Sequence, residues 1–255
     1  MTADGSATSD DAALGGRLIL RQPLRGHRFG HDSILLAAAT PAQAQEHAVE
    51  LGAGVGAAGL ALARRVEGLA VTLVEIDPAL AALAQDNAAR NRLAARVRAI
   101  CLDVAAPAAT FAAAGLLAGS ADCVLMNPPF NAPQNPSPVR SRSAARTGSP
   151  ETLAVWLNTA SRLLAPGGTV ALIWRADGLS DVLAALSADF AAVVILPIYP
   201  KPDAPAIRVL VRAVKASKAA LSLLPGLILA DKNGKPTPES EAVLRDGAAL
   251  PFPAT

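Results

Sequence analysis

Four residues in the middle of the chain, Asn127-Pro128-Pro129-Phe130, have the composition of a site that positions a planar amine. Prolines restrict φ and constrain the preceding residue, so the Asn127 side-chain oxygen and the Pro128 carbonyl are held where both can point at one NH₂ group. Two such acceptors draw the amine hydrogens aside and aim the nitrogen lone pair at an electrophile. Phe130 offers a flat face for stacking, worth on the order of 1–3 kcal/mol for a base. The alternative is a rigid Asx-Pro turn with a buried phenylalanine.

A second candidate site is the glycine-rich segment Glu50-Leu-Gly-Ala-Gly-Val-Gly56, which Gly59 follows. It comes directly after an apolar run and opens a helical pattern, where backbone N–H groups and the helix dipole face a ligand. We expect Gly52, Gly54 and Gly56 to let a cofactor approach the main chain, and Glu75 to bind ribose hydroxyls. Glycines that merely permit a tight turn between strand and helix remain the alternative.

Two further acids narrow the choice of cofactor. Glu50 ends the first predicted strand and Asp103 follows the third. Carboxylates at successive strand ends suit a ligand that carries both an ammonium group and an adenine amine. This description fits S-adenosylmethionine better than NAD. Taken singly, Glu50 could instead bind a loop or a helix dipole, and Asp103 could be an ordinary strand-end carboxylate.

The elements that would position these residues alternate between β-branched apolar runs and helical patterns, which is typical of a parallel sheet covered on both faces. A helix is expected to begin at Ser149-Pro150-Glu151 and to end at Pro166-Gly167-Gly168. The sequence therefore predicts an α/β, Rossmann-like fold with seven mostly parallel strands. The predicted strands are residues 47–51, 71–75, 96–102, 122–126, 169–174, 191–197 and 207–214.

Composition sets the class and organisation of the chain. Its 255 residues are 52% apolar, and 23 basic against 21 acidic residues give a net charge of +2. We expect residues 1–16 to be a flexible acidic tail and residues 17–255 to be a single domain, with a C-terminal appendix at about 215–250. No membrane segment, signal peptide or metal-ligand spacing is recognisable, so we predict a cytoplasmic protein without a metal.

Basic residues indicate where an anionic substrate would bind. Asn131 to Gly148 is rich in Pro, Ser and Asn and carries three arginines and no acid, which is unusual for a simple connection. A solvated basic face is the alternative to a phosphate-binding role. The candidate phosphate contacts in this loop and in the last strand are Arg140, Arg142, Arg146, Arg208 and Arg212.

Taken together, Glu50 to Gly56, Val74-Glu-Ile-Asp-Pro78 and Asn127 to Phe130 resemble class I S-adenosylmethionine-dependent methyltransferases that modify amino nitrogens. Residues 17–250 more closely resemble the tRNA adenine-N6 methyltransferase family, which acts on the adenosine beside the anticodon of valine tRNA. The resemblance implies cofactor over the glycines, ribose on Glu75, adenine near Asp103, and the target amine at Asn127 with Phe130 stacking. Members of that family commonly carry Tyr where this chain has Phe130, and the long basic loop is a second departure.

Other functions share parts of this pattern. A methyltransferase of ribosomal-RNA guanine N2 and a methyltransferase of a protein glutamine amide both use the tetrapeptide, although the chain lacks the helical N-terminal domain usual in the latter family. From a different class, a NAD-binding oxidoreductase or a non-catalytic nucleotide-binding module would also use the glycine-rich turn. Binding of S-adenosylmethionine but not NAD would reject the oxidoreductase, and turnover would reject the inert module.

Overall fold

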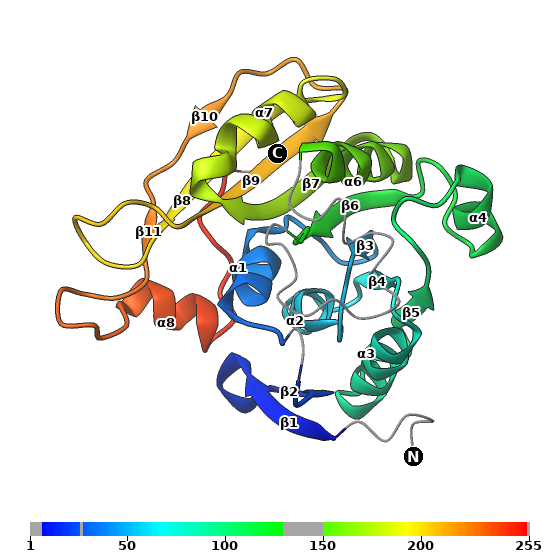
Figure 1. Ribbon diagram of the computed structural model, residues 1–255, viewed down its shortest axis with the longest axis horizontal. Helices are drawn as coiled ribbons and strands as arrows, with labels where there is room; N and C mark the ends of the chain where they lie inside the picture. Colours follow the sequence, from blue (N-terminus) through cyan, green and yellow to red (C-terminus); the bar gives the residue numbers. More distant parts are fainter. Residues whose placement is uncertain (1–6, 26–27, 130–149, 254–255) are drawn as a thin grey trace.

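A computed structural model describes residues 7–25, 28–129 and 150–253 and contains one large sheet flanked by helices (Figure 1). Each run predicted as a strand forms one, because β-branched and apolar side chains fill both faces of a buried sheet. Within the described residues, the sheet consists of β3 (His47–Leu51), β4 (Ala70–Glu75), β5 (Val97–Cys101), β6 (Ala121–Met126), β7 (Leu164–Arg175), β8 (Phe190–Tyr199), β9 (Arg208–Lys215), β10 (Ser222–Leu223) and β11 (Leu227–Ile228).

The strand order is β10-β8-β9-β7-β6-β3-β4-β5, with β11 also paired to β8. Strands β5, β4, β3, β6 and β7 are parallel, whereas β9 runs antiparallel between β7 and β8. The order reverses at β3, so the segments after β3 and β6 leave the sheet at a topological switch point, where open α/β sheets bind ligands. The predicted α/β class with a mostly parallel central sheet is confirmed, and β10 and β11 extend the sheet beyond the seven predicted strands.

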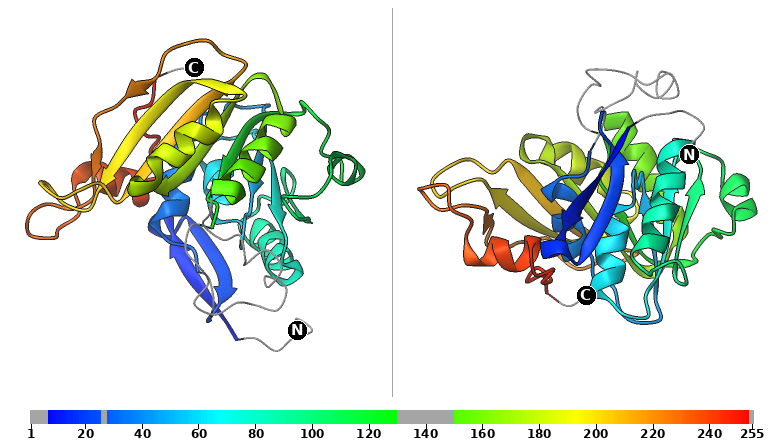
Figure 2. Two further views of the ribbon diagram at one scale, coloured as in Figure 1. Left: turned by 45° about the horizontal axis from the view of Figure 1, so that its top comes forward. Right: turned by 90° about the horizontal axis from the view of Figure 1, so that it is seen from below.

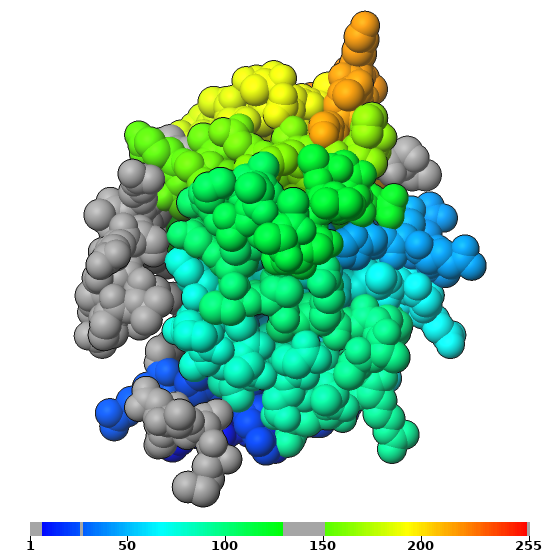
Figure 3. Space-filling view, turned by 90° about the vertical axis from the view of Figure 1, so that its right-hand side faces the viewer, coloured from blue at the N-terminus to red at the C-terminus, as the bar shows by residue number. Residues whose placement is uncertain are grey.

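Two groups of helices cover the sheet. The apolar core on one face is formed with α1 (His31–Ala39), α2 (Ala57–Arg65), α3 (Pro78–Arg90) and α8 (Pro238–Leu244). The core on the other face is formed with α4 (Ala108–Ala113), α6 (Pro150–Leu163) and α7 (Leu179–Leu186), which follows a short 3-10 turn at Ala176–Gly178. Figure 2 shows α6 and α7 in front of β7 and β8 (left), and Figure 3 shows the surface of the molecule on the side of α3 and α4.

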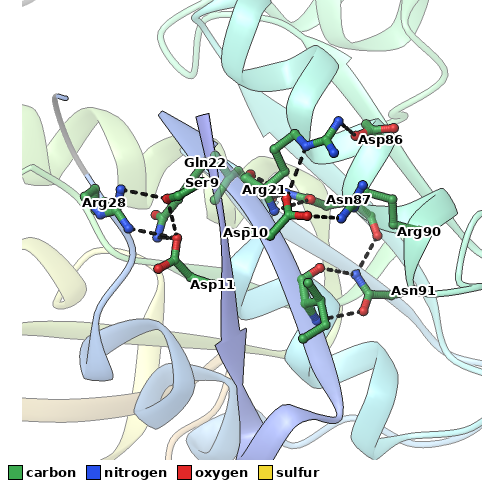
Figure 4. Close-up of polar contacts among 12 residues, drawn as sticks. Ser9, Asp10, Asp11, Arg21, Gln22, Arg28, Asp86, Asn87, Arg90 and Asn91 are labelled. Atoms are coloured by element: carbon green, nitrogen blue, oxygen red, sulfur yellow. Dashed lines mark hydrogen bonds and ion pairs between the residues drawn. The ribbon is translucent and has the colours of Figure 1, made fainter. Parts of the chain in front are cut away.

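The N-terminal region is ordered where a flexible tail was predicted. β1 (Thr8–Ala13) pairs antiparallel with β2 (Leu18–Pro23) through a 3-10 turn at Leu14–Gly16. The prediction is therefore wrong for residues 8–16, because the acids that suggested a solvated tail are paired. Asp10 lies 2.6 Å from Arg90 and 3.2 Å from Arg21, and Asp11 lies 2.8 Å from Arg28 (Figure 4).

Two asparagines, one in α3 and one directly after it, dock this hairpin on the rest of the fold (Figure 4). Asn91 accepts the Ile19 N–H at 3.0 Å and donates to the Ile19 carbonyl at 2.8 Å. Asn87 makes the same two bonds with Arg21, at 2.7 and 2.9 Å, and also donates to the Val55 carbonyl at 3.1 Å. The two side-chain amides thus bond to the main chain of β2 as a neighbouring strand would. Asn87 also joins the hairpin to the glycine-rich turn.

The C-terminal segment extends the sheet and then returns across it. β10 and β11 pair parallel with β8, and α8 begins after Thr237, whose hydroxyl accepts the Ser240 N–H at 3.1 Å. Thr237 caps the helix, because its hydroxyl satisfies a free N–H of the first turn, and Pro238 takes the first helical position. Within the described ranges, no helix combines the length and the hydrophobicity that crossing a membrane requires.

Candidate active site

The carboxyl ends of β3, β4 and β6 bring three predicted segments together. Leu51 at the end of β3 is in register with Val74 of β4 and with Met126 of β6. The glycine-rich turn, Glu75 and Asn127 therefore leave the sheet side by side. The sequence placed each segment after a strand, and the parallel order of the strands makes them neighbours.

Asn127 presents a hydrogen-bond acceptor that the described structure leaves without a partner. Its Oδ1 atom is buried and accepts no hydrogen bond from any described residue. Burying such an acceptor costs about 1–3 kcal/mol unless a donor arrives. Pro128 is buried next to it, whereas Phe130 lies outside the described residues. An amine donor bound beside Asn127 would satisfy the free oxygen.

Glu75 links the end of β4 to the glycine-rich turn. Its Oε2 atom accepts the Gly54 N–H at 2.8 Å, and its Oε1 atom accepts the Asp77 N–H at 2.9 Å. The residue is 3% exposed. Each carboxylate oxygen has two lone pairs, so both oxygens keep capacity for a ligand hydroxyl. Glu75 also holds the main chain of Gly54 in place.

The glycines of the turn differ in what lies beside them. Gly52 has φ +68°, and a Cβ there would lie 2.3 Å from Cη2 of Trp156. Gly54 has φ +57°, and a Cβ there would meet no atom within 4 Å. Gly56, with φ +85°, precedes the first residue of α2. Gly54 therefore faces open space that a cofactor could fill, whereas Gly52 is required by packing within the protein.

Trp156 is a site residue that sequence reasoning missed. It lies on α6, is half-buried, and places its ring against Gly52 while packing on the core of that face. A tryptophan on a helix normally indicates core packing, and the sequence offers no signal that this helix passes over the glycine-rich turn. Its position on the turn makes it a candidate wall of the cofactor site.

Glu50 lies beneath the turn rather than at its surface. It is 5% exposed, and its Oε2 atom accepts the Gly59 N–H of α2 at 2.7 Å. Gly59 permits this approach, since a Cβ there would be 2.7 Å from the same oxygen. Burial raises the pKa of the Glu50 carboxyl to about 8, although the Gly59 N–H opposes the shift. The contact predicted with a cofactor ammonium stays a prediction.

Asp103 and Arg208 lie near the same edge of the sheet. Asp103 is exposed two residues beyond β5, and its Oδ1 atom accepts the Ala105 N–H at 2.8 Å. Arg208 begins β9 opposite the last residue of β7, and its Nε atom lies 2.9 Å from Asp32 Oδ2 at the start of α1. The Arg208 guanidinium is therefore neutralised in part, and its predicted contact with phosphate stays untested.

Arg212 does not accompany Arg208. Four residues of strand separate them by roughly 14 Å, and Arg212 is 5% exposed. Arg212 therefore lies away from the active-site edge that Arg208 marks, and its predicted contact with phosphate stays untested. The other predicted arginines, Arg140, Arg142 and Arg146, lie outside the described residues. No cluster of three or more potential metal ligands occurs in the part of the chain that the structure describes.

The fold and the site together define a methyltransferase of class I architecture. The chain belongs to the methyltransferase small domain family, which it matches over residues 27–196. A solved structure of a predicted O-methyltransferase from Agrobacterium tumefaciens is 30% identical, covers 86% of this chain and 98% of its own, and superposes with a TM-score of 0.73. The predicted enzyme class and its dependence on S-adenosylmethionine are confirmed.

Several relatives carry the name tRNA1(Val) (adenine(37)-N6)-methyltransferase, among them the following two. One from Dickeya chrysanthemi is 27% identical over 225 residues, which cover 86% of this chain and 87% of the relative. One from Porphyromonas gingivalis is 32% identical over 161 residues, and the match spans 61% of the length of each protein. The resemblance to this family is confirmed, at modest identity.

Proposed function

We propose that this chain methylates N6 of an adenine in tRNA, at the nucleotide beside the anticodon, with S-adenosylmethionine as donor. Asn127, Pro128 and Phe130 hold the target base, and the glycine-rich turn with Glu75 and Asp103 holds the cofactor. The names of the two tRNA-modifying relatives support the substrate class. Because tRNA is the substrate, we propose that the enzyme works in the cytoplasm.

The observation that carries the proposal is the buried, unpartnered Oδ1 atom of Asn127. An exocyclic NH₂ group has two hydrogens, and the Asn127 oxygen with the Pro128 carbonyl supplies two acceptors for them. These bonds turn the nitrogen lone pair away from the ring, which is the direction needed for in-line attack. Catalysis then consists of positioning and of preorganised acceptors, and no nucleophilic side chain is required.

The residues at the edge of the sheet suit the proposed cofactor. S-adenosylmethionine, when bound, supplies an electrophilic methyl group on a sulfonium. The open side of Gly54 admits it to the main chain, and the free lone pairs of Glu75 suit its ribose hydroxyls. Asp103, exposed beyond β5, suits the adenine amine. These residues bind and orient the cofactor, while Asn127 accepts a hydrogen bond from the target amine.

The target base must leave its stack in the anticodon loop to reach Asn127, as in other enzymes that modify bases. Recognition of the loop then depends on phosphate contacts and stacking. Arg140, Arg142, Arg146 and Arg208 are the proposed phosphate contacts. An enzyme acting on a hydroxyl would have a single hydrogen to accept and would need a base, so the paired acceptors favour an amine over an O-methyl product.

Nucleoside mass spectrometry tests the proposal directly. The protein is incubated with S-adenosylmethionine and with unmodified tRNA or rRNA, and each RNA is digested and analysed. We expect N6-methyladenosine in tRNA alone. N2-methylguanosine in rRNA would replace the proposal with the first alternative. No methylated nucleoside in either RNA, with cofactor binding shown by calorimetry, would redirect the assignment to a protein amide.

Two asparagine variants separate the chemical role from a structural one. Asn127→Ala removes the buried acceptor, and we expect a loss of about 2–3 kcal/mol of transition-state stabilisation, or 30- to 150-fold in kcat/KM. Cofactor affinity should be unchanged. Asn158→Ala, on the exposed side of α6, is the matched control and should behave as wild type. Near-wild-type turnover of Asn127→Ala would contradict the role given to Asn127.

A further inference from the structure

A cavity lies at the edge of the sheet opposite the active site. It has a volume of about 530 Å³ and opens at the amino ends of β3, β6 and β7, against the ends of α1 and α2 and the segment around Phe252. Such a volume lies within the range of roughly 300–1,000 Å³ typical of small-molecule sites. We call it the amino-edge cavity.

Two guanidinium groups line the amino-edge cavity, those of Arg65 and Arg212. Arg65 ends α2, and its Nη2 atom donates to the carbonyls of Ala37 and Thr40 at the end of α1, at 3.0 and 2.6 Å. Arg212 lies with its Cζ atom 4.9 Å from the centroid of the Phe252 ring. The cavity therefore contains two cations carried by rigid elements, one by a helix that covers the sheet and one by a strand within it.

The hydrogen-bonding capacity of these arginines is largely unused. The Nε atoms of both are buried without a partner among the described residues. Among the described residues, Arg212 makes one hydrogen bond, a contact of 3.5 Å from Nη1 to the Pro253 carbonyl. Arg65 binds only through Nη2, where it caps α1. A guanidinium has five N–H donors, and a buried donor without an acceptor is costly.

No carboxylate of the described chain neutralises either cation within ion-pair distance. Burial lowers the pKa of both guanidiniums, and the charge of Arg65 adds to the effect on Arg212, whose pKa falls to about 10. Glu46 and Asp122 also line the cavity, but their carboxylates accept the main-chain N–H groups of Gln43 and His47, each at 2.8 Å.

We propose that the amino-edge cavity binds a small oxyanion, the phosphate or carboxylate group of a free metabolite, between Arg65 and Arg212. Oxyanions match the planar fork of a guanidinium, and one placed between two would satisfy both charges. The carboxylates of Glu46 and Asp122 repel a chain of phosphates, which favours a compact anion over an RNA backbone. The site is separate from the proposed methyl transfer and does not depend on it.

Calorimetry with inorganic phosphate tests this site in the full chain, at constant ionic strength set with chloride. We expect saturable binding that weakens at least tenfold in Arg212→Met and in Arg65→Met. Arg245→Met, which removes an arginine 70% exposed on its side chain, is the matched control and should bind as wild type. Absence of saturable binding up to ~10 mM phosphate, or unchanged affinity in both cavity variants, would overturn the proposal.

Thermal unfolding distinguishes a ligand site from a structural arginine. In phosphate-free buffer Arg212→Met should melt no lower than wild type, because an apolar side chain of similar size replaces an unpaired buried charge. Phosphate should raise the Tm of wild type and not that of Arg212→Met. If the variant has a lower Tm and phosphate does not change the Tm of wild type, Arg212 has a structural role alone. Displacement of phosphate by tRNA would overturn the assignment to a free metabolite.

Discussion

Replacing Glu50 with glutamine should change how the stability of the protein depends on pH. The carboxyl of Glu50 is buried between β3 and α2, and burial raises its pKa from 4.5 to about 8. Between these values the folded state keeps a proton that the unfolded state releases, so wild-type stability falls as pH rises through this window. Above pH 8 the stability that the protonated Glu50 carboxyl contributes has been lost.

The size of the effect follows from the same shift. A difference of 3.5 units, from 4.5 to 8, corresponds to ~5 kcal/mol at 1.36 kcal/mol per unit. Between pH 5.5 and 8.5 the portion lost is about 3 kcal/mol. Glu50→Gln removes the titration and keeps an acceptor for the Gly59 N–H. The variant should therefore gain about 3 kcal/mol relative to wild type across that interval.

Urea unfolding at pH 5.5, 7.0 and 8.5 measures this difference directly. Glu67→Gln, at an exposed position shortly after α2, is the matched control and should follow wild type at each pH. A constant difference between Glu50→Gln and wild type over the three values would refute a buried carboxyl with a raised pKa.

The same titration tests the predicted contact between Glu50 and the cofactor ammonium. A cation beside the carboxylate favours its charged form, so binding of S-adenosylmethionine near pH 7 should release close to one proton. Calorimetry in buffers of different ionisation enthalpy counts the released protons, with Glu50→Gln as the reference. Binding without proton release would leave Glu50 as an internal partner of Gly59 and remove it from the cofactor site.

Three further perturbations test the packing around the site. Gly54→Ala should lower the free energy of unfolding by only about 1–2 kcal/mol, because of its positive φ, but should weaken cofactor binding. Gly52→Ala should lower the free energy of unfolding more, because its Cβ would collide with Trp156. Urea unfolding measures the stability of both variants, and calorimetry measures their cofactor affinity. Asn87→Ala should cost about 2–4 kcal/mol in urea unfolding, since it removes bonds to both the hairpin and the glycine-rich turn; a smaller loss than in a surface control would contradict that linkage. Asp10→Asn should cost less than about 1 kcal/mol in the same assay, since its ion pairs are partly exposed.

The sequence predicts the central sheet well because its signals are local. β-branched runs, caps and glycine turns determine where strands begin and end, and parallel connection places their carboxyl ends together. The N-terminal hairpin lacks such signals in its first strand, since Thr8–Ala13 carries two acids and no Val, Ile, Leu or aromatic residue. Its stability comes from partners distant in sequence, among them Arg90 and the amides of Asn87 and Asn91. Long-range pairing of this kind cannot be read from composition.

Side-chain direction explains why some site residues were predicted correctly in position but not in environment. Along β3 alternate residues face opposite layers, and Ala48 and Glu50 therefore share the face covered by α2. Gly59 leaves room for the Glu50 carboxyl on that face. The strand period and a glycine nine residues later were both present in the sequence, so this burial could have been inferred.

The two arginines of β9 show how distance along a strand decides function. Arg208 and Arg212 stand on the same face, four residues apart, and charge alone groups them as one basic surface. The strand instead carries them to opposite edges of the sheet: Arg208 pairs with Asp32 beside the active site, and Arg212 enters the amino-edge cavity with Arg65. A basic residue in a strand therefore has to be assigned to an edge before it is assigned to a ligand. On that reasoning the substrate edge retains Arg208, and the opposite edge holds a separate site for an anion.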